Sequence, residues 1–190
     1  MAPNQPPWPR EWLLTDDRLG AALWPLLERV PIGSGVMLRH DHLADDRRRA
    51  MAERIGEVAA RRGLVLAVAG DVALARAVGA RLVHRPVGDS GDMPVSLPVH
   101  DEGEAEAARR RGAALVFVSP VFATRSHPGG ATLGTERAAM LARHSGAPAI
   151  ALGGMSRARF TALATEFHGW AGIDAWIGGE SGQNLNAVPT

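Results

Sequence analysis

The sequence lacks three residue types on which many enzymes depend. Its 190 residues include no cysteine, no tyrosine and no lysine, so every one of the 21 basic residues is arginine. Without cysteine there is no thiolate nucleophile, thiolate metal ligand or disulfide. Without lysine there is no Schiff-base catalysis, attached pyridoxal phosphate or P-loop, because each of these needs a side-chain amine.

Long hydrophobic runs and a strong net charge are also missing. No apolar run approaches the roughly 20 residues that cross a bilayer, and the first residues, MAPNQPPWPREW, lack the apolar core of a signal peptide. The formal net charge is +1, and the pI of about 9.0 reflects how few groups titrate between histidine and arginine. We therefore expect a cytoplasmic protein whose partners include neither nucleic acid nor a membrane.

Eight short apolar runs recur along the chain, with helix-like segments between most of them. The runs are nearly continuously apolar, as parallel strands covered on both faces should be. They span residues 12–15, 35–40, 64–70, 81–86, 94–99, 114–122, 148–154 and 172–178. Amphipathic spacing and end signals predict helices at 41–63, 71–80, 101–112, 135–146 and 156–169. The connection at 86–93 is too short for a full helix.

This alternation predicts a single α/β domain, a (β/α)8 TIM barrel trimmed below the typical length of about 250 residues. An open doubly wound sheet is the alternative. We expect the barrel to span residues 11–179, between a proline-rich extension at 1–10 and a polar tail at 180–190.

Polar residues gather where the predicted strands end, which is where barrel enzymes carry their chemistry. The segment SPVFATRSHPGG (119–130) follows the sixth strand and could hold a phosphoryl group through Thr124, Arg125, Ser126 and His127. After the seventh strand, Gly153 and Gly154 open into a helix, which would present backbone N–H groups to an anion. A solvated loop and a tight glycine turn are the structural alternatives for these two segments.

Histidines also lie at predicted strand ends. His100 closes the fifth strand just before a helix, where it could transfer a proton near neutral pH or could cap and orient the loop. His40 and His42 are two residues apart with no third ligand, so we do not expect a transition-metal site.

Several segments resemble the thiamine phosphate synthase and thiazole tautomerase superfamily, which is built on a (β/α)8 barrel. GAALVFVSPVFATRSHPGGATLG (112–134) is similar to the family's Gly-Ala-Asp-Tyr strand and the Pro-x-Phe-x-Thr-x-(Thr/Ser)-Lys loop that follows it. APAIALGGM (147–155) is similar to Pro-Val-x-Ala-Ile-Gly-Gly-Ile, and AVGARLVH (77–84) to Ala-x-Gly-Ala-Asp-Gly-Val-His. The resemblance covers nearly the whole chain.

The resemblance implies a thiamine-biosynthesis transferase that couples hydroxymethylpyrimidine diphosphate to thiazole phosphate and releases diphosphate with the help of Mg²⁺. The residues that it implies for catalysis and for contact with the two phosphorylated heterocycles are Arg39, Thr124, Ser126, Gly153 and Gly154. Asp89 would be a magnesium ligand, with Asp71 as a second. A homodimer is a further expectation, since barrels of this kind often self-associate.

The chain also departs from the family pattern. The family's Gln-x-Arg-x-Lys is here MLRHD (37–41), its Asn-Asp-Arg turn is AGD (69–71), and its loop lysine is His127. These losses leave two alternatives open. One is a thiazole tautomerase in which His100, at the position of that family's acid/base histidine, moves a proton without a metal. The other is a barrel that binds a phosphorylated metabolite without turnover.

Overall fold

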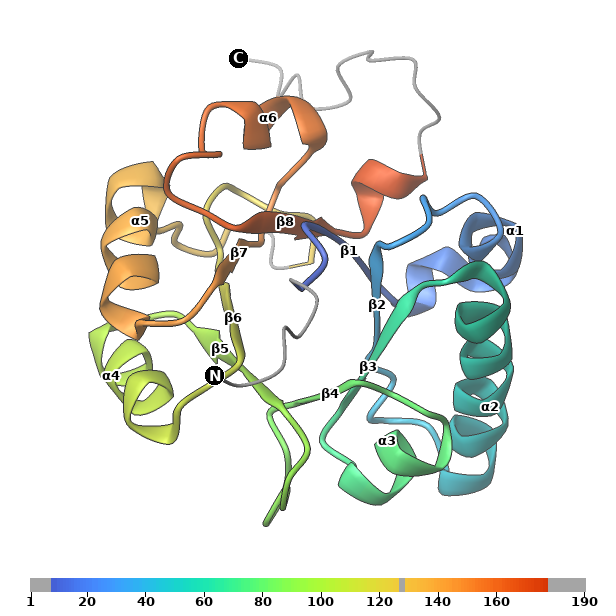
Figure 1. The fold of residues 1–190 in the computed structure, drawn as a ribbon. Helices are drawn as coiled ribbons and strands as arrows, with labels where there is room; N and C mark the ends of the chain where they lie inside the picture. Colours follow the sequence, from blue (N-terminus) through green and yellow to red (C-terminus); the bar gives the residue numbers. More distant parts are fainter. Residues whose placement is uncertain (1–7, 127–128, 178–190) are drawn as a thin grey trace.

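The computed structural model describes residues 8–126 and 129–177, so His127 and the tail at 180–190 lie outside the described residues, as does most of the extension at 1–10. Eight parallel strands form a closed barrel in which each strand pairs with the next and β8 pairs back with β1 (Figure 1). The strands are β1 (Glu11–Leu14), β2 (Gly35–Leu38), β3 (Val65–Ala69), β4 (Leu82–His84), β5 (Val95–Val99), β6 (Leu115–Val118), β7 (Ala149–Ala151) and β8 (Gly169–Gly172). The predicted (β/α)8 barrel is confirmed, and the open-sheet alternative is wrong.

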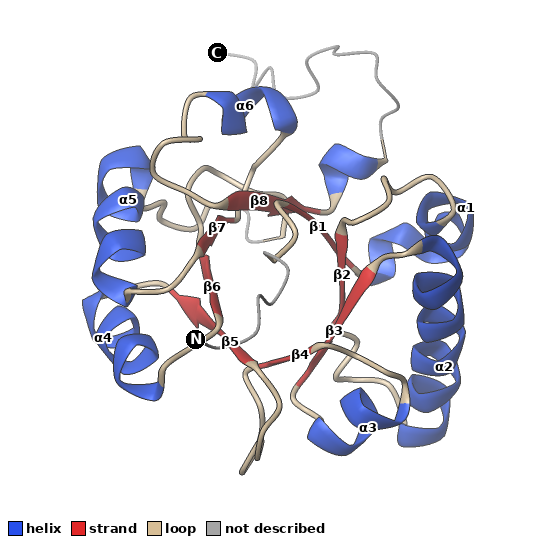
Figure 2. Ribbon diagram, in the orientation of Figure 1, coloured by secondary structure: helices blue, strands red, loops and turns tan. Residues whose placement is uncertain are grey.

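Helices surround the barrel on its outside (Figure 2). They are α1 (Leu23–Leu27), α2 (Asp45–Arg62), α3 (Val72–Ala77), α4 (Glu102–Arg111), α5 (Gly134–Ser145) and α6 (Arg157–Thr161), with two 3-10 helices, η1 (Asp17–Ala22) and η2 (Asp174–Trp176). The expected end signals operate at α4, where the Asp101 side chain accepts from the Glu104 amide and Gly112, at φ 64°, ends the helix. Among the described residues, no helix joins β4 to β5, as the short connection predicted. Nowhere in residues 8–126 and 129–177 is a helix long and apolar enough to cross a membrane.

The last strand lies earlier than the sequence predicted. The apolar run at 172–178 was expected to form it, but β8 is Gly169–Gly172 and η2 follows. The strand begins at a glycine because a Cβ on Gly169 would lie 2.1 Å from the carbonyl oxygen of Arg10. Trp176 packs on the barrel without belonging to a strand. Its ring stacks on Trp170 with centroids 5.4 Å apart, and its indole nitrogen donates to the Trp12 carbonyl.

The first and last helices along the chain also differ from expectation. The helix predicted at 156–169 is limited to α6, since the chain has to enter β8 at residue 169. The segment between β1 and β2, for which no helix was predicted, forms η1 and α1. Both are short, and a short helix shows little amphipathic spacing in the sequence.

Aromatic rings from non-adjacent strands fill the barrel interior. Trp12 of β1 and Phe117 of β6 meet edge to face, with centroids 5.6 Å apart and planes at 83°. Because β1 and β6 are not neighbours in the sheet, this contact crosses the lumen. Gly35 of β2 makes room for it, since a Cβ there would lie 2.2 Å from the Trp12 indole. The packed interior leaves the rim at the carboxyl ends of the strands as the place for a site.

Candidate active site

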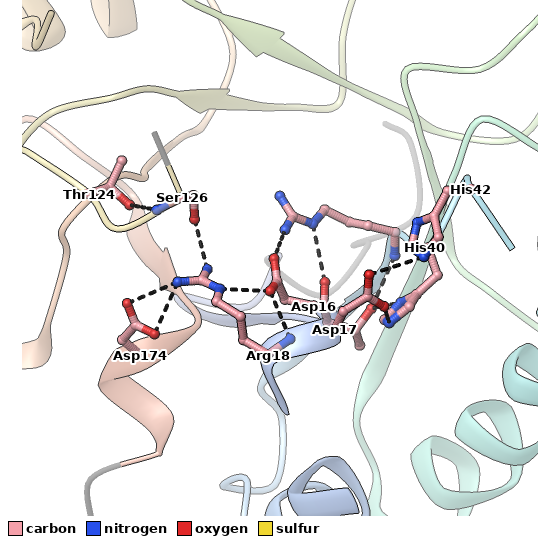
Figure 3. Close-up of polar contacts among 10 residues, drawn as sticks. Asp16, Asp17, Arg18, His40, His42, Thr124, Ser126 and Asp174 are labelled. Carbon is pink, nitrogen blue, oxygen red and sulfur yellow. Dashed lines mark hydrogen bonds and ion pairs between the residues drawn. The ribbon is translucent and has the colours of Figure 1, made fainter. Parts of the chain in front are cut away.

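Two arginines at this rim share one carboxylate. Arg39, directly after β2, places Nη2 2.6 Å from Asp16 Oδ2. Arg18 of η1 places Nε 2.8 Å from Asp16 Oδ1 (Figure 3). Burial by itself raises the pKa of Asp16, but the hydrogen bonds and charge of Arg18, together with the charge of Arg39, outweigh it and hold the pKa below its ordinary value. The carboxylate therefore stays ionised at neutral pH and orients both guanidinium groups.

Thr15, directly after β1, holds the backbone of Arg39 and the ring of His40 in place. Its buried hydroxyl accepts from the Arg39 amide at 3.1 Å and lies 3.0 Å from Nδ1 of His40. An ionised carboxylate only accepts, so the 3.2 Å contact between Nε2 and Asp17 places the ring proton on Nε2, and Nδ1 of the neutral ring then accepts from the Thr15 hydroxyl. Burial lowers the pKa of His40 against the opposing charge of Asp17. His40, whose backbone has φ 38°, is thus a neutral support of the rim.

The loops after β6 and β7 pack on each other and bring two predicted site segments together. The Phe122 amide donates to the Gly153 carbonyl at 3.1 Å. A Cβ on Gly153 would lie 2.7 Å from Pro120 Cα, and one on Gly154 would lie 2.4 Å from the Ala123 carbonyl oxygen. Both glycines have positive φ, 95° and 59°. The packing of the two loops therefore requires glycine here, in line with the tight-turn alternative, and their contact with a phosphate stays a prediction.

The helix expected to open at this turn is short. α6 has five residues, and Ser156 caps it by accepting from the Arg159 amide at 3.3 Å. So short a helix has a small macrodipole. The Arg159 guanidinium donates to the Gly154 carbonyl and lies 4.9 Å from the centroid of the Phe122 ring. Positive charge near this turn thus comes from a side chain.

Arg18, which the sequence did not single out, joins the β6 loop to the rest of the rim. Its Nη2 donates to the Ser126 hydroxyl at 2.8 Å, and the Ser126 amide lies 3.3 Å from the Thr124 hydroxyl (Figure 3). Thr124 is half-buried, whereas Arg125 and Ser126 are exposed. Ser126 thus lies beside Arg18, with Thr124 next to it, and their contact with a phosphoryl group stays a prediction. Arg18 and Ser126 are 108 positions apart, so no local spacing could reveal the contact.

His100 is held by a carboxylate from the following helix. Glu104 Oε2 lies 2.7 Å from both the backbone nitrogen and Nδ1 of His100. This contact orients the loop, as the structural alternative supposed, and also fixes the ring in the way that a base is oriented by a third group. Nearby, His84 lies 3.0 Å from the buried Ser96 hydroxyl through Nδ1. Burial lowers the pKa of His84 to about 3, helped by the charges of Arg85, Arg39 and His100, so that ring is neutral.

The two predicted magnesium ligands each accept a backbone hydrogen bond within their own segment. Asp71 Oδ1 accepts from the Leu74 amide at 2.8 Å and caps α3, while Asp89 Oδ1 accepts from the Gly91 amide at 2.9 Å. No group of three histidine, aspartate or glutamate side chains in residues 8–126 and 129–177 could hold a metal ion. Magnesium prefers an octahedral set of oxygens. Because the ion is usually held by one or two carboxylates together with substrate phosphates, the roles of Asp71 and Asp89 as magnesium ligands stay a prediction.

A cavity of about 550 Å³ beside the rim shows what surrounds Asp71 instead. Asp71 lines it together with Asp41, Arg48 and Arg85. Arg48 Nη2 lies 3.0 Å from Asp41 Oδ1 and Arg85 Nη2 lies 3.8 Å from Asp41 Oδ2. The neighbouring carboxylate of Asp41 is thus paired with two arginine side chains.

These features define a (β/α)8 barrel whose candidate site lies on the loops that follow its strands, the position of the active site in barrel enzymes. The profile of the family described as thiamine monophosphate synthase matches residues 27–176. The chain belongs to that family, as its motifs predicted.

Individual relatives agree with this assignment. The thiamine-phosphate synthase of Chloroflexus aurantiacus is 30% identical over 166 residues, which cover 78% of this chain and 76% of that protein. The thiamine-phosphate synthase of Lactococcus lactis is 28% identical over 131 residues, which cover 62% of this chain and only 60% of that protein. The structure of thiamine phosphate pyrophosphorylase from Pyrococcus furiosus shares the fold, with a TM-score of 0.78 over 92% of this chain and 90% of that chain at 18% identity.

Proposed function

We propose that the chain is a transferase of the thiamine-phosphate-synthase type, which couples hydroxymethylpyrimidine diphosphate to thiazole phosphate. The observation that carries the proposal is the pair of guanidinium groups, Arg18 and Arg39, held by Asp16 at the rim of a barrel of this family. Guanidinium groups bind phosphoryl oxygens through paired, charge-assisted hydrogen bonds. The proposed ligands are small phosphorylated heterocycles.

The reaction asks mainly for positioning and charge stabilisation. The carbon–oxygen bond between the pyrimidine methylene and diphosphate breaks, diphosphate leaves with the electron pair, and the thiazole nitrogen bonds to the methylene carbon. Arg39 would stabilise the charge that grows on the departing diphosphate. Thr124 and Ser126 would hold phosphoryl oxygens so that the two reactants face each other.

The test is the formation of thiamine phosphate and diphosphate from the two substrates, with and without Mg²⁺. Replacing Arg39→Gln should lower kcat/KM by about tenfold to a hundredfold, the value of one charge-assisted contact. Arg61→Gln is the matched control, because Arg61 pairs with Glu28 at the end of α2, on the opposite face of the barrel. No product at high enzyme concentration would rule the transferase out.

One observation favours a second function, thiazole tautomerase. His100 has Nδ1 on Glu104, which leaves Nε2 as the atom to take up and return a proton. Substituting His100→Ala should then abolish isomerisation of the thiazole while thiazole phosphate still binds. An unchanged rate would discard this role. Thermal stabilisation by phosphate ligands without turnover in either assay would instead support the non-catalytic barrel.

A further inference from the structure

Arg18 lies where three loops of the rim meet. Its own loop follows β1, Ser126 belongs to the loop after β6, and Asp174 begins η2 after β8. Nε pairs with Asp16 at 2.8 Å, Nη1 lies 3.4 Å from each oxygen of Asp174, and Nη2 donates to Ser126 at 2.8 Å (Figure 3). Among the described arginines, Arg18 is the one whose guanidinium contacts all three of these loops.

The three contacts of Arg18 are unequal. The bond to Asp16 is short and charge-assisted, and Asp16 is mostly buried. The contact with Asp174 is longer than the 2.7–2.9 Å of a good N–H···O⁻ bond and involves a carboxylate that is 38% exposed. Ser126 offers a neutral hydroxyl. Arg18 is therefore fixed through Nε, while both of its Nη groups have partners that a stronger acceptor could displace.

The surroundings of the two Nη groups suit a phosphoryl group. The Ser126 hydroxyl accepts from Arg18, so its own hydrogen remains to be donated, and the Thr124 hydroxyl accepts from the Ser126 amide in the same way. An oxyanion placed there would receive two N–H donors and two O–H donors. In a chain without lysine, arginine is the side chain that can supply a permanent positive charge at this loop.

We propose that Arg18 binds a phosphoryl group of the substrate together with Ser126 and Thr124, and that Asp174 competes with that group for the same guanidinium. The inference deepens the proposed function, on which it rests for the nature of the ligand, a phosphate monoester. Asp174 thereby lowers the affinity of the site for phosphate, and Arg18 raises it.

The test is calorimetric titration of the full chain with inorganic phosphate and with thiazole phosphate. Arg18→Gln should weaken binding about tenfold or more, as expected for loss of a charge-assisted contact. Asp174→Asn should strengthen it about twofold to fivefold, the range of an exposed ion pair. Arg61→Gln should leave the affinity unchanged.

The opposite signs separate a ligand contact from a purely structural tie between loops. If Arg18 only held the loops together, both variants would lose stability and both would bind more weakly, which would overturn the inference. Absence of phosphate binding by the unmodified protein would also overturn it. Asp174→Asn keeps the test decisive if Arg18→Gln does not fold.

The result is separable from the fate of the proposed function. The expected binding pattern without formation of thiamine phosphate would refute the transferase and uphold the Arg18 site. Formation of thiamine phosphate with unaltered binding and turnover in Arg18→Gln would uphold the transferase and refute the Arg18 site.

Discussion

Glu104 binds His100 through a single oxygen that lies 2.7 Å from both the backbone nitrogen and Nδ1 of that histidine. Because the carboxylate accepts both hydrogens, the neutral ring should carry its proton on Nδ1, the less common tautomer in free histidine. We expect Glu104→Gln to convert the ring to a mixture of tautomers, which nitrogen-15 NMR of the imidazole measures directly. Glu106→Gln is the control, since Glu106 pairs with Arg109 on the same helix. An Nδ1-protonated ring that persists in Glu104→Gln would contradict the assignment.

Substitution of Gly154→Ala tests the packing of the β6 and β7 loops. The new Cβ would lie 2.4 Å from the Ala123 carbonyl oxygen at a backbone φ of 59°, so the β6 loop has to move. We expect a loss of about 2–3 kcal/mol in the free energy of unfolding, combining overpacking and strain. Gly79→Ala separates the two causes, because Gly79 has φ 68° but nothing within 4 Å of its Cβ position. Equal losses in urea denaturation of both variants would show that the clash is absent.

Gly35→Ala tests how tightly the barrel interior is filled. Its Cβ would lie 2.2 Å from the Trp12 indole, which is fully buried and packs edge to face on Phe117. The ring cannot move aside, so we expect the free energy of unfolding to fall by about 3 kcal/mol or more. Gly103→Ala, in the exposed first turn of α4, should cost much less, because its Cβ would meet only the Asp101 carboxylate at 3.3 Å and alanine favours a helix. Thermal unfolding of the two variants checks the contrast.

His84 should make the protein less stable in acid. Its pKa is about 3 in the folded chain, against about 6.5 when unfolded, so between these values the unfolded state binds more protons. The stability that the neutral ring allows is fully present above pH 6.5 and falls as the pH decreases. Between pH 7 and pH 5 we expect a loss of about 1–2 kcal/mol that is absent in His84→Gln. Urea denaturation at both pH values measures this loss, with the exposed His144→Gln as control. An equal change in unfolding free energy between pH 7 and pH 5 in the unmodified chain, His84→Gln and His144→Gln would refute the prediction.

Asp71 should behave as a helix cap and not as a metal ligand. Asp71→Ala removes the acceptor for the Leu74 amide and should cost about 1 kcal/mol of unfolding free energy. Binding of inorganic diphosphate should respond to Mg²⁺ and to EDTA in the same way in Asp71→Ala, in Asp89→Ala and in the unmodified chain. If either substitution removed a magnesium-dependent part of the affinity, the carboxylate would be a ligand after all.

The architecture could be predicted because strands and helices alternate with clear periodicity and clear end signals. The failure at the last strand has a physical cause. The run at 172–178 is apolar because Trp176 covers Trp170 on the sheet, and a short apolar run gives no sign of whether it pairs as a strand or packs as a turn. Gly169 begins β8 because the Arg10 backbone passes so close, and that contact joins residues at opposite ends of the chain.

The site could be predicted only as far as each residue's place at a strand end. That rule located Arg39, Ser126 and His100 at the rim. It could not show that Asp71 uses its carboxylate on its own helix, since a capping residue and a ligand occupy the same position after a strand. It also overlooked Arg18, whose partner Asp174 is 156 positions away, because the barrel's closure alone makes them neighbours.

The helix-free connection between β4 and β5 has a consequence for how such a chain could acquire new parts. The segment from 86 to 92 is largely exposed, and Val87, 85% exposed, borders the cavity beside the rim. Loop tips of this kind tolerate insertion of a foreign domain or relocation of the termini by circular permutation. A domain grafted there would stand next to this cavity, so a place where the barrel can be extended is also one from which an added module could regulate access to the rim.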